Sequence, residues 1–178
     1  MSVPSPDRLL LDRMPTPIGT MLLVTDGEGY LRALDWDDYE DRLHKLMHRY
    51  YGASAALRSG AAPDAVRGPL TAYFAGALQA LGRIPAATNG TAFQHRVWTA
   101  LRKIPAGTTL SYGALAKRIG HAAAVRAVGL ANGANPISVV VPCHRVIGSD
   151  GTLTGYGGGL ERKRWLLAHE GVTLRVAV

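Results

Sequence analysis

Residues 111–131 have the sequence SYGALAKRIGHAAAVRAVGLA, which predicts two short helices joined by a turn. Ser111 can cap a first helix over residues 112–119 with its side-chain oxygen, and Gly120 ends that helix. A second helix then fits residues 122–131. Two short helices around a tight glycine turn have the spacing of a helix-turn-helix motif, although most helix pairs of this kind bind nothing.

The second predicted helix is poor in long polar side chains. Arg126 is the long side chain on its expected exposed side, and alanine and glycine occupy much of the rest. Reading base edges in a DNA major groove requires Arg, Asn, Gln or Ser along one face, which this helix lacks. A surface of small residues would instead let the backbone approach a partner closely in a narrow groove, with Arg126 as a single probe. A buried alanine-rich helix with an ion-paired arginine is the alternative.

The rest of the chain predicts strands and helices in mixed order. Residues 18–25 and 30–36 predict the two strands of a hairpin, separated by a turn-forming Asp-Gly-Glu-Gly segment. Apolar stripes over residues 43–50 and 66–77 predict two helices packed on a core. A further amphipathic helix is predicted over residues 93–101, before a Pro-Ala-Gly turn.

Charge and composition divide the chain near its middle. The segment from Gly82 to Gly90 predicts an interdomain linker. Residues 1–90 carry nine basic and ten acidic groups, a net charge of −1, whereas residues 91–178 carry eleven and three, a net charge of +8. The second half therefore indicates either a polyanion-binding domain or a basic surface kept for solubility. We expect an N-terminal domain over 1–88 and a C-terminal domain over 89–178.

Length and composition are those of a globular protein. The 178 residues suffice for one domain or two small ones, with 47% hydrophobic and 19% charged residues. No apolar run reaches the ~18 residues that a membrane-spanning helix needs. Residues 1–8 lack the basic and then apolar pattern of a secretory signal. We therefore expect a soluble, cytoplasmic protein.

Cys143 is the one cysteine of the chain, which excludes an intramolecular disulfide and a cysteine-rich zinc site. A lone cysteine is usually a small buried apolar residue. Here it follows residues 137–141, Ile-Ser-Val-Val-Val, which predict a buried strand. A strand end suits a nucleophile, and His144 and Arg145 beside it could favour the reactive thiolate.

A base for this nucleophile requires further support. Adjacent residues on a strand point to opposite faces, so His144 reaches the Cys143 sulfur only if the chain turns or a water bridges the two. The carboxylates of residues 91–178 that could orient the imidazole are Asp150, Glu161 and Glu170. Glu170 ends a predicted helix, where an acidic group is unfavourable against the helix dipole, so it has either a functional role or a plain surface position.

Several motifs of the second half occur in a recognisable order. They are Arg126-Ala127-Val128-Gly129, Asn135-Pro136, Pro142-Cys143-His144-Arg145-Val146, Gly155-Tyr156-Gly157-Gly158-Gly159-Leu160 and Trp165-Leu166-Leu167-Ala168-His169-Glu170-Gly171. With these motifs, residues 91–171 closely resemble the O6-alkylguanine-DNA alkyltransferases of the constitutive bacterial type. Two segments resemble the N-terminal part of bacterial members, Thr16-Pro17-Ile18-Gly19 and Tyr73-Phe74-Ala75-Gly76.

The resemblance implies an α+β fold and a DNA repair reaction without a cofactor. The fold would be an N-terminal ribonuclease H-like β-sheet with helices, followed by a mainly helical domain with a winged helix-turn-helix-like motif. Cys143 would take the alkyl group from O6 of guanine, and from O4 of thymine, by direct displacement, so each molecule would act once as a cysteine methyltransferase. His144 would deprotonate the thiol through a water, with Glu170 orienting the imidazole. Asn135 would hold the turn before the cysteine.

The resemblance also implies that the damaged nucleotide is flipped out of the duplex, because a stacked base cannot meet the sulfur in line. The small-residue helix would enter the minor groove, where Arg126 fills the gap left by the flipped base. Tyr112 would push the phosphate and donate to the leaving purine. The residues expected to contact DNA beside Arg126 are Tyr112, Ala124, Ala127, Gly129 and Ala131.

The base pocket implied by the resemblance comprises Val146, Tyr156, Gly157 and Gly158, and it does not include Met1. The backbone carbonyls of Cys143 and Val146 would face the guanine amino group, and the glycines would let backbone N–H groups approach O6. Some relatives have serine at the position of Gly157, so a hydroxyl contact is absent here and the pocket could accept bulkier alkyl groups. The zinc-binding positions of some eukaryotic relatives have no counterpart, so we expect no metal.

Double-stranded DNA carrying O6-alkylguanine or O4-alkylthymine is therefore the expected partner, with no membrane. We expect a monomer, and self-association along DNA stays open. Two other functions are compatible with the residues: a non-catalytic helix-turn-helix regulator or lesion sensor, and a cysteine hydrolase using Cys143 and His144. The three functions differ in their products, since alkyl transfer alone leaves a group on the protein.

Overall fold

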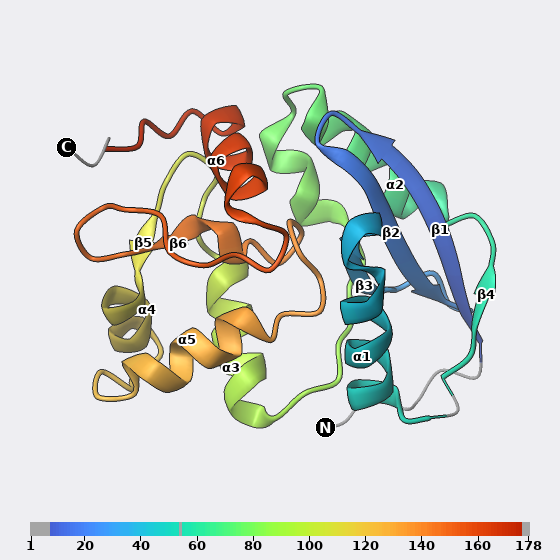
Figure 1. The fold of residues 1–178 in the computed structure, drawn as a ribbon, viewed down its shortest axis with the longest axis horizontal. Helices are drawn as coiled ribbons and strands as arrows, with labels where there is room; N and C mark the ends of the chain where they lie inside the picture. The colour runs from blue at the N-terminus through green and yellow to red at the C-terminus, as the bar shows by residue number, and fades with distance from the viewer. Residues whose placement is uncertain (1–7, 54, 176–178) are drawn as a thin grey trace. The chain divides into compact units, whose positions relative to one another are not determined.

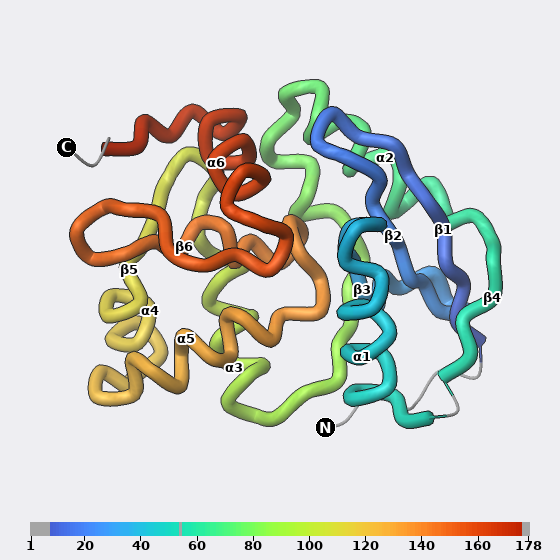
Figure 2. The backbone as a smooth tube through the Cα atoms, in the orientation of Figure 1, coloured from blue at the N-terminus to red at the C-terminus, as the bar shows by residue number. Residues whose placement is uncertain are grey.

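Residues 8–53 and 55–175 are described by the computed structural model of the chain, drawn as a ribbon in Figure 1 and as a backbone tube in Figure 2. The chain divides between Gly90 and Thr91 into two compact units, which we call unit 1 and unit 2. The boundary expected from the sequence lies two residues earlier, between residues 88 and 89. Unit 2 therefore contains the basic half of the chain.

Unit 1 contains a four-stranded sheet with the order β3-β2-β1-β4. Its strands are β1 (Leu9–Thr16), β2 (Gly19–Asp26), β3 (Leu31–Trp36) and β4 (Leu57–Ser59). Strand β2 pairs antiparallel with β1 and β3, whereas β4 pairs parallel with β1. The hairpin predicted over residues 18–25 and 30–36 is confirmed as β2 and β3. No alternating pattern predicts β1, because Asp12 and Arg13 follow three leucines.

Two α-helices and two 3-10 helices complete unit 1. They are η1 (Asp37–Tyr39), α1 (Glu40–Tyr51), α2 (Asp64–Phe74) and η2 (Leu78–Arg83). The two α-helices carry the apolar stripes predicted from the sequence, and Figure 1 shows α1 alongside β3. One core cluster joins α1 to the sheet and contains Leu9, Leu22, Val24, Ala33, Leu43, Met47 and Tyr51. The middle of the expected linker is attached to β3, because the N–H of Leu31 donates to the carbonyl of Pro85 and the N–H of Ala87 donates to the carbonyl of Leu31.

Unit 2 is mainly helical. Its helices are α3 (Ala92–Arg102), α4 (Tyr112–Arg118), α5 (Val125–Gly133) and α6 (Leu160–His169). Its short elements are the parallel pair β5 (Leu110–Ser111) and β6 (Val146–Ile147), and the 3-10 turn η3 (Cys143–Arg145). The helix predicted over residues 93–101 is confirmed as α3, which begins with a capping box of Thr91 and Gln94. No helix in the described part of the chain is long and apolar enough to cross a lipid bilayer.

The first helix of the predicted pair, α4, has the cap that the sequence indicates. The Ser111 hydroxyl accepts a hydrogen bond from the backbone N–H of Ala114 at 3.0 Å. Gly120 follows the helix with a φ of 77°, in the left-handed region that favours glycine. The predicted helix over residues 112–119 is therefore confirmed, with its end one residue earlier, at Arg118.

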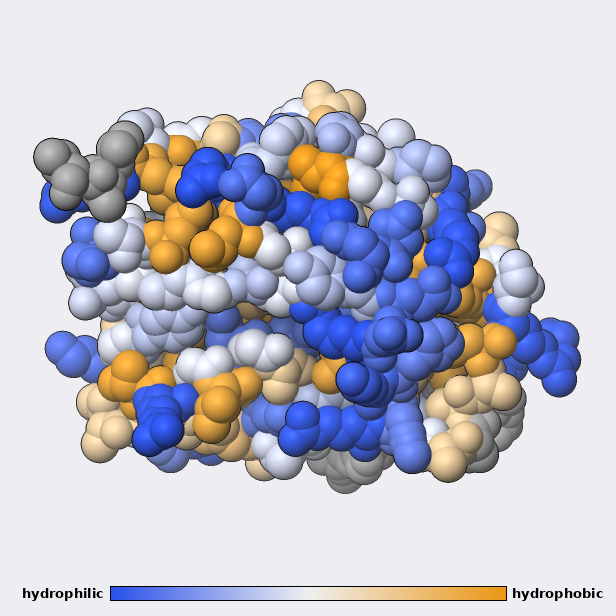
Figure 3. All heavy atoms as spheres, in the orientation of Figure 1, coloured by the Kyte–Doolittle hydropathy of each residue, from blue (hydrophilic) through white to orange (hydrophobic). Residues whose placement is uncertain are grey.

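The second helix of the pair, α5, is shorter than predicted. It begins at Val125 and not at residue 122, because the N–H of Ala124 donates to the carbonyl of His121 at 2.8 Å and closes a turn. Figure 3 shows hydrophobic and hydrophilic side chains intermixed over the part of unit 2 where Figure 1 places α4 and α5. The exposed large hydrophobic side chains of α5 are Val125 and Leu130. An exposed face of α5 thus combines apolar side chains with Arg126.

Candidate active site

The segment before Cys143 consists of tight turns, and the strand predicted over residues 137–141 is wrong. The N–H of Val141 donates to the carbonyl of Ile137 at 3.0 Å, and the N–H of Cys143 donates to the carbonyl of Val141 at 2.8 Å. Val139 has a φ of 69°, in the left-handed region that β-branched residues rarely adopt. The apolar run correctly indicates burial, but a short buried run does not by itself distinguish a strand from turns.

Asn135 holds these turns with its side-chain amide. Its Nδ2 atom donates to the carbonyls of Val141 at 2.8 Å and Ile137 at 3.4 Å, and its Oδ1 atom accepts from the N–H of Ile137 at 3.0 Å. The side chain is buried, so these bonds satisfy polar groups that water does not reach. One side chain therefore fixes the backbone path that leads into Cys143.

Cys143 begins the turn η3 and is 6% exposed. Neighbouring side chains on a strand would point to opposite faces, but the backbone turns at this residue. A turn at this point or a bridging water is what His144 needs in order to accept the proton of the Cys143 thiol. The local backbone is thus compatible with an imidazole that acts on the thiol.

Glu170 joins His144 and Arg145 into one buried cluster. Its Oε1 atom accepts from Nε2 of His144 at 2.9 Å and from Nη2 of Arg145 at 2.8 Å, and its Oε2 atom accepts from Nε of Arg145 at 2.9 Å. Arg145 also donates through Nη1 to the carbonyl of Ile104 at 2.6 Å. Glu170 is 4% exposed, so the plain surface position that the sequence leaves open is excluded.

Burial and pairing set the charge states of this cluster. Burial raises the pKa of Glu170, but the hydrogen bonds and charges of His144 and Arg145 outweigh it and hold that pKa well below its usual range. Burial lowers the pKa of His144, and Glu170 opposes this only in part. The imidazole is therefore neutral near pH 7, with its Nε2–H donating to Glu170. Its Nδ1 atom has no hydrogen-bond partner among the described residues and is the nitrogen that can accept a proton.

One face of α5 presents Arg126 among small residues. The exposed residues of α5 are Val125, Arg126, Ala127, Leu130 and Gly133, of which Arg126, Leu130 and Gly133 recur at helical spacing. Ala124 caps the start of this face, and Gly129 lies half-buried at its margin. Ala131 lies on the opposite side, 3% exposed, and its carbonyl accepts a hydrogen bond from Nε1 of Trp98 at 2.9 Å. The helical period therefore turns Ala131 toward the core, and its expected contact with DNA stays a prediction.

Tyr112, the first residue of α4, connects this helix pair to the segment between β6 and α6. A Cβ on Gly129 of α5 would lie 3.8 Å from Cδ1 of the Tyr112 ring. The Tyr112 phenol oxygen accepts a hydrogen bond from Oγ1 of Thr154 at 2.9 Å. Two residues further along the chain, the ring of Tyr156 packs edge-on against the imidazole of His144, with centroids 6.5 Å apart. Contacts therefore lead from α5 through Tyr112 toward the buried cluster.

Known proteins share this arrangement of sequence and structure. A family model described as 6-O-methylguanine DNA methyltransferase, DNA binding domain, matches residues 92–172. The methylated-DNA--protein-cysteine methyltransferase of Salmonella typhimurium is 50% identical over 94% of this chain and 98% of its own length. The chain belongs to the methylated-DNA--protein-cysteine methyltransferase family.

Other relatives of this methyltransferase are similarly close. The protein of the same name from Mycobacterium bovis is 59% identical over 87% of this chain and 88% of its own length. A crystal structure of Mycobacterium tuberculosis OGT in complex with DNA has a TM-score of 0.74 and 41% identity, covering 91% of this chain and 93% of that chain. Both units therefore have counterparts in a solved relative.

The residues expected in the base pocket of this methyltransferase come from two segments. Val146 is buried in β6, whereas Tyr156, Gly157 and Gly158 lie between β6 and α6. The carbonyl of Val146 accepts a hydrogen bond from Nζ of Lys163 at 2.7 Å. Gly157 is exposed and Gly158 is buried. Gly157, which stands where some relatives have serine, is thus the exposed glycine of the two.

The N-terminal end of the chain contributes no test of this pocket. Met1, which is not expected among the pocket residues, lies outside the residues that the structure describes. The structure does not describe residues 2–7 either, which belong to the segment without a secretory signal pattern. The exclusion of Met1 from the pocket therefore stays a prediction.

Lys163 is a residue of this methyltransferase that the sequence motifs do not single out. Its side chain is fully buried, and its Nζ atom donates to three backbone carbonyls, those of Val146 (2.7 Å), Thr154 (3.1 Å) and Gly155 (3.5 Å). Burial lowers the pKa of Lys163 to about 8, while the negative form of Cys143 acts in the opposite direction. The sequence contains a signal for a buried lysine, because Lys163 lies between Leu160 and Leu167 on one helical stripe. A lysine in such a stripe requires buried hydrogen-bond partners.

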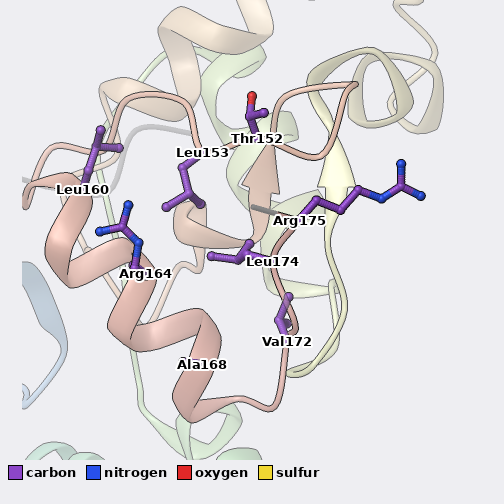
Figure 4. A pocket seen from close by; sticks show the side chains of 8 residues that line it. All are labelled: Thr152, Leu153, Leu160, Arg164, Ala168, Val172, Leu174 and Arg175. Atoms are coloured by element: carbon purple, nitrogen blue, oxygen red, sulfur yellow. The ribbon is translucent and has the colours of Figure 1, made fainter. Parts of the chain in front are cut away.

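A groove on unit 2 lies apart from the site residues of the methyltransferase. Its volume is about 520 Å³, and its lining comprises Thr152, Leu153, Leu160, Arg164, Ala168, Val172, Leu174 and Arg175. Figure 4 shows apolar side chains from α6 and from the segment after it pointing toward this groove. Over residues 8–53 and 55–175, no group of three or more His, Cys, Asp or Glu side chains is arranged to hold a metal ion.

Proposed function

We propose that this chain repairs DNA by transferring the alkyl group of O6-alkylguanine in a duplex to the sulfur of Cys143. The observation that supports this best is the buried cluster of His144, Arg145 and Glu170, which keeps a neutral imidazole next in the chain to the single thiol. Membership of the methyltransferase family and the DNA complex of a 41% identical relative support the same reaction. O4-alkylthymine is a second substrate in this proposal, and no cofactor takes part.

The reaction is a direct displacement at the alkyl carbon. Nδ1 of His144 accepts the thiol proton through a water, and Glu170 stabilises the imidazolium that forms. The Cys143 thiolate attacks the alkyl carbon, so that a C–S bond forms while the C–O6 bond breaks and its electron pair stays on the purine. Tyr112 donates its phenol proton to the departing purine, and solvent exchange later carries the proton on His144 back to the phenolate. The thioether is stable, so each molecule acts once.

The damaged base must leave the duplex to reach this sulfur. Cys143 is 6% exposed, so a stacked base cannot be attacked in line, and extrusion costs a few kcal/mol. Arg126 fills the gap that the base leaves, while Ala127 and Gly129 let the α5 backbone approach the minor groove closely. The net charge of +8 over residues 91–178 holds the duplex without reading its sequence, because phosphate contacts carry no sequence information.

Several finer features belong to this proposal. The N-terminal domain of this proposal, over residues 1–88, is a ribonuclease H-like sheet with helices. Residues 89–178 form the DNA-binding and catalytic domain, in which α4 and α5 are the helices of a winged helix-turn-helix-like motif. The flipped guanine enters the pocket of Val146, Tyr156, Gly157 and Gly158. The protein acts as a monomer in the cytoplasm.

Intact-mass measurement tests the reaction. Protein mixed with an excess of a duplex carrying one O6-methylguanine should gain one methyl group in place of one hydrogen, in every molecule and once only. A duplex with guanine at the same position is the matched control and should produce no gain. Peptide mapping should place the methyl group on the peptide that contains Cys143. An unchanged mass with the damaged duplex would overturn the proposal.

The two rival functions give different results in the same samples. A lesion sensor would bind the damaged duplex and keep its original mass. A cysteine hydrolase that uses Cys143 and His144 would cleave a small ester or amide repeatedly. Alkyl transfer instead gives a burst that stops at one methyl group per protein molecule.

Replacing Arg126 with alanine should slow repair of duplex DNA by about a hundredfold, because the extruded state loses the side chain that fills the gap and extrusion costs a few kcal/mol. The control Arg118→Ala removes an exposed arginine from the end of α4 and should reduce only DNA affinity, by a small factor. On a single strand, where no base pair must open, Arg126→Ala should react almost as fast as the original protein. Single-turnover mass measurements give these rates, and equal losses from the two variants would contradict a role in extrusion.

A further inference from the structure

Thr154, which is not among the expected site residues, contacts Tyr112 through its side chain. Its Oγ1 atom donates a hydrogen bond to the phenol oxygen of Tyr112 at 2.9 Å, and the bond is partly buried. The two residues are 42 positions apart, with Tyr112 at the start of α4 and Thr154 between β6 and α6. The bond therefore joins the DNA-binding helix pair of the proposed function to the segment that forms the base pocket.

The backbone of Thr154 is itself held in place. Its carbonyl accepts a hydrogen bond from Nζ of Lys163 at 3.1 Å, and the same nitrogen donates to the carbonyl of Val146 at 2.7 Å. Lys163 is fully buried; its bond to Val146 is buried and its bond to Thr154 is partly buried. The Thr154 hydroxyl consequently has a defined position relative to Val146 in the proposed base pocket.

The bond from Thr154 constrains what the Tyr112 hydroxyl can do. A phenol oxygen has one proton to donate and lone pairs that accept. Either hydroxyl can donate in this contact, and the arrangement in which Thr154 donates leaves the phenol proton for an acceptor other than Thr154. An accepted hydrogen bond also polarises the O–H group and strengthens the bond that it donates.

We propose that Thr154 is a positioning residue for alkyl transfer: its hydroxyl orients the Tyr112 phenol so that the phenol proton faces the departing purine. This inference rests on the proposed function, in which Tyr112 protonates the leaving group. It assigns Thr154 to the transfer step, because the Thr154 hydroxyl orients the phenol proton that Tyr112 gives to the purine.

Two substitutions at this position separate the hydroxyl from the shape of the side chain. Thr154→Val keeps the branched shape and removes the donor, and it should lower the single-turnover rate at saturating duplex by about three- to tenfold, the range of one hydrogen bond. Thr154→Ser keeps the donor and should retain most of the rate. The dissociation constant for the duplex should be the same in all three proteins. Thermal unfolding of each variant shows that the fold is intact.

A double-mutant cycle with Tyr112→Phe tests whether Thr154 acts through the phenol. In the Tyr112→Phe protein, Thr154→Val should have no further effect on the transfer rate, because the oxygen that it orients is gone. Additive losses, an unchanged rate in Thr154→Val, or a faster rate from a released phenol proton would each overturn the inference. These outcomes require that the original protein gains the methyl group. Its failure to do so would overturn the proposed function instead.

Discussion

Serine in place of Cys143 is expected to abolish alkyl transfer completely. The nucleophile is the thiolate, and a thiol with a pKa near 8.5 loses its proton to a neutral imidazole far more readily than a hydroxyl does. The replacement changes one atom, so the turns held by Asn135 and the cluster around Glu170 should stay in place. The chain has no second cysteine that could accept the group instead. Intact mass after incubation with an O6-methylguanine duplex should therefore stay unchanged, while electrophoretic mobility should show that the duplex is still bound.

A relocated thiol provides the control for this variant. Ser138 is buried in the turns that precede Cys143, five positions earlier in the chain. A protein carrying both Cys143→Ser and Ser138→Cys has a thiol in the same buried segment but outside the turn η3. We expect it to remain inactive, because the acceptor must lie next to His144. Methylation of this double variant would show that any thiol in the segment suffices and would contradict the assigned geometry.

Glutamine in place of Glu170 is expected to lower the free energy of unfolding by about 3–5 kcal/mol, the usual effect of removing one partner from a buried ion pair. Glutamine preserves the shape and one acceptor, but it leaves the charge of Arg145 uncompensated at 6% exposure. It also removes the anion that stabilises the imidazolium of His144, so the transfer rate at pH 7 should fall as well. Urea unfolding followed by circular dichroism measures the first effect, and single-turnover mass measurement the second.

Glu161 offers a matched control at the opposite end of the same helix, since it lies in the first turn of α6 and Glu170 follows its last residue. It pairs with Arg164 at 2.9 Å, but its side chain is 92% exposed, so solvent screens the pair. Glu161→Gln removes the same charge by the same substitution and should leave both stability and transfer rate almost unchanged. Similar losses in the two variants would mean that net charge, and not the buried cluster, determines the effect.

The same cluster predicts how stability depends on pH. Burial lowers the pKa of His144 in the folded chain. Below the ordinary value of 6.5 the unfolded chain therefore binds a proton that the folded chain does not, and the free energy of unfolding decreases as the pH is lowered. The pKa of Glu170 is also lowered in the fold, because its partners outweigh burial, so a second loss begins below the ordinary value of 4.5. Urea midpoints measured from pH 8 down to about pH 3 should decrease in this order. In the Glu170→Gln protein, the loss of stability below pH 4.5 should be smaller.

Local sequence signals predict most helices and the central hairpin, because each of these elements carries its own periodicity and caps. Ser111 and Gly120 indicate the limits of α4 within one residue. The predicted start of α5 is too early, since three consecutive alanines favour a helix but form a turn closed on His121. Strand β1 is not predicted because its pairing with β2 and β4 is a long-range property that its own residues do not show.

The active site is predictable only in part. Cys143 and His144 are adjacent in sequence, but the resemblance to a known family supplies the role of Glu170, 26 positions from His144. The turns over residues 137–141 depend on the amide of Asn135, and an apolar run alone does not reveal such side-chain bonds. The place of Lys163 on an apolar helical stripe indicates burial, but its partners are backbone carbonyls, which no residue pattern displays. The missing information is in each case a contact between segments distant in sequence or a hydrogen bond to the backbone.

The burial of Cys143 has a kinetic consequence for a protein that acts once. An enzyme with repeated turnover must open its site in every cycle to release product, and this opening often limits its rate. In the proposed reaction the alkylated product is the protein itself, so only the repaired base has to leave. A nucleophile that is 6% exposed beside an imidazole that is fully buried therefore imposes no penalty on later cycles, because no later cycle exists. Selection on this site can therefore favour a rigid interior that activates the thiol, because the site need not open repeatedly to release product.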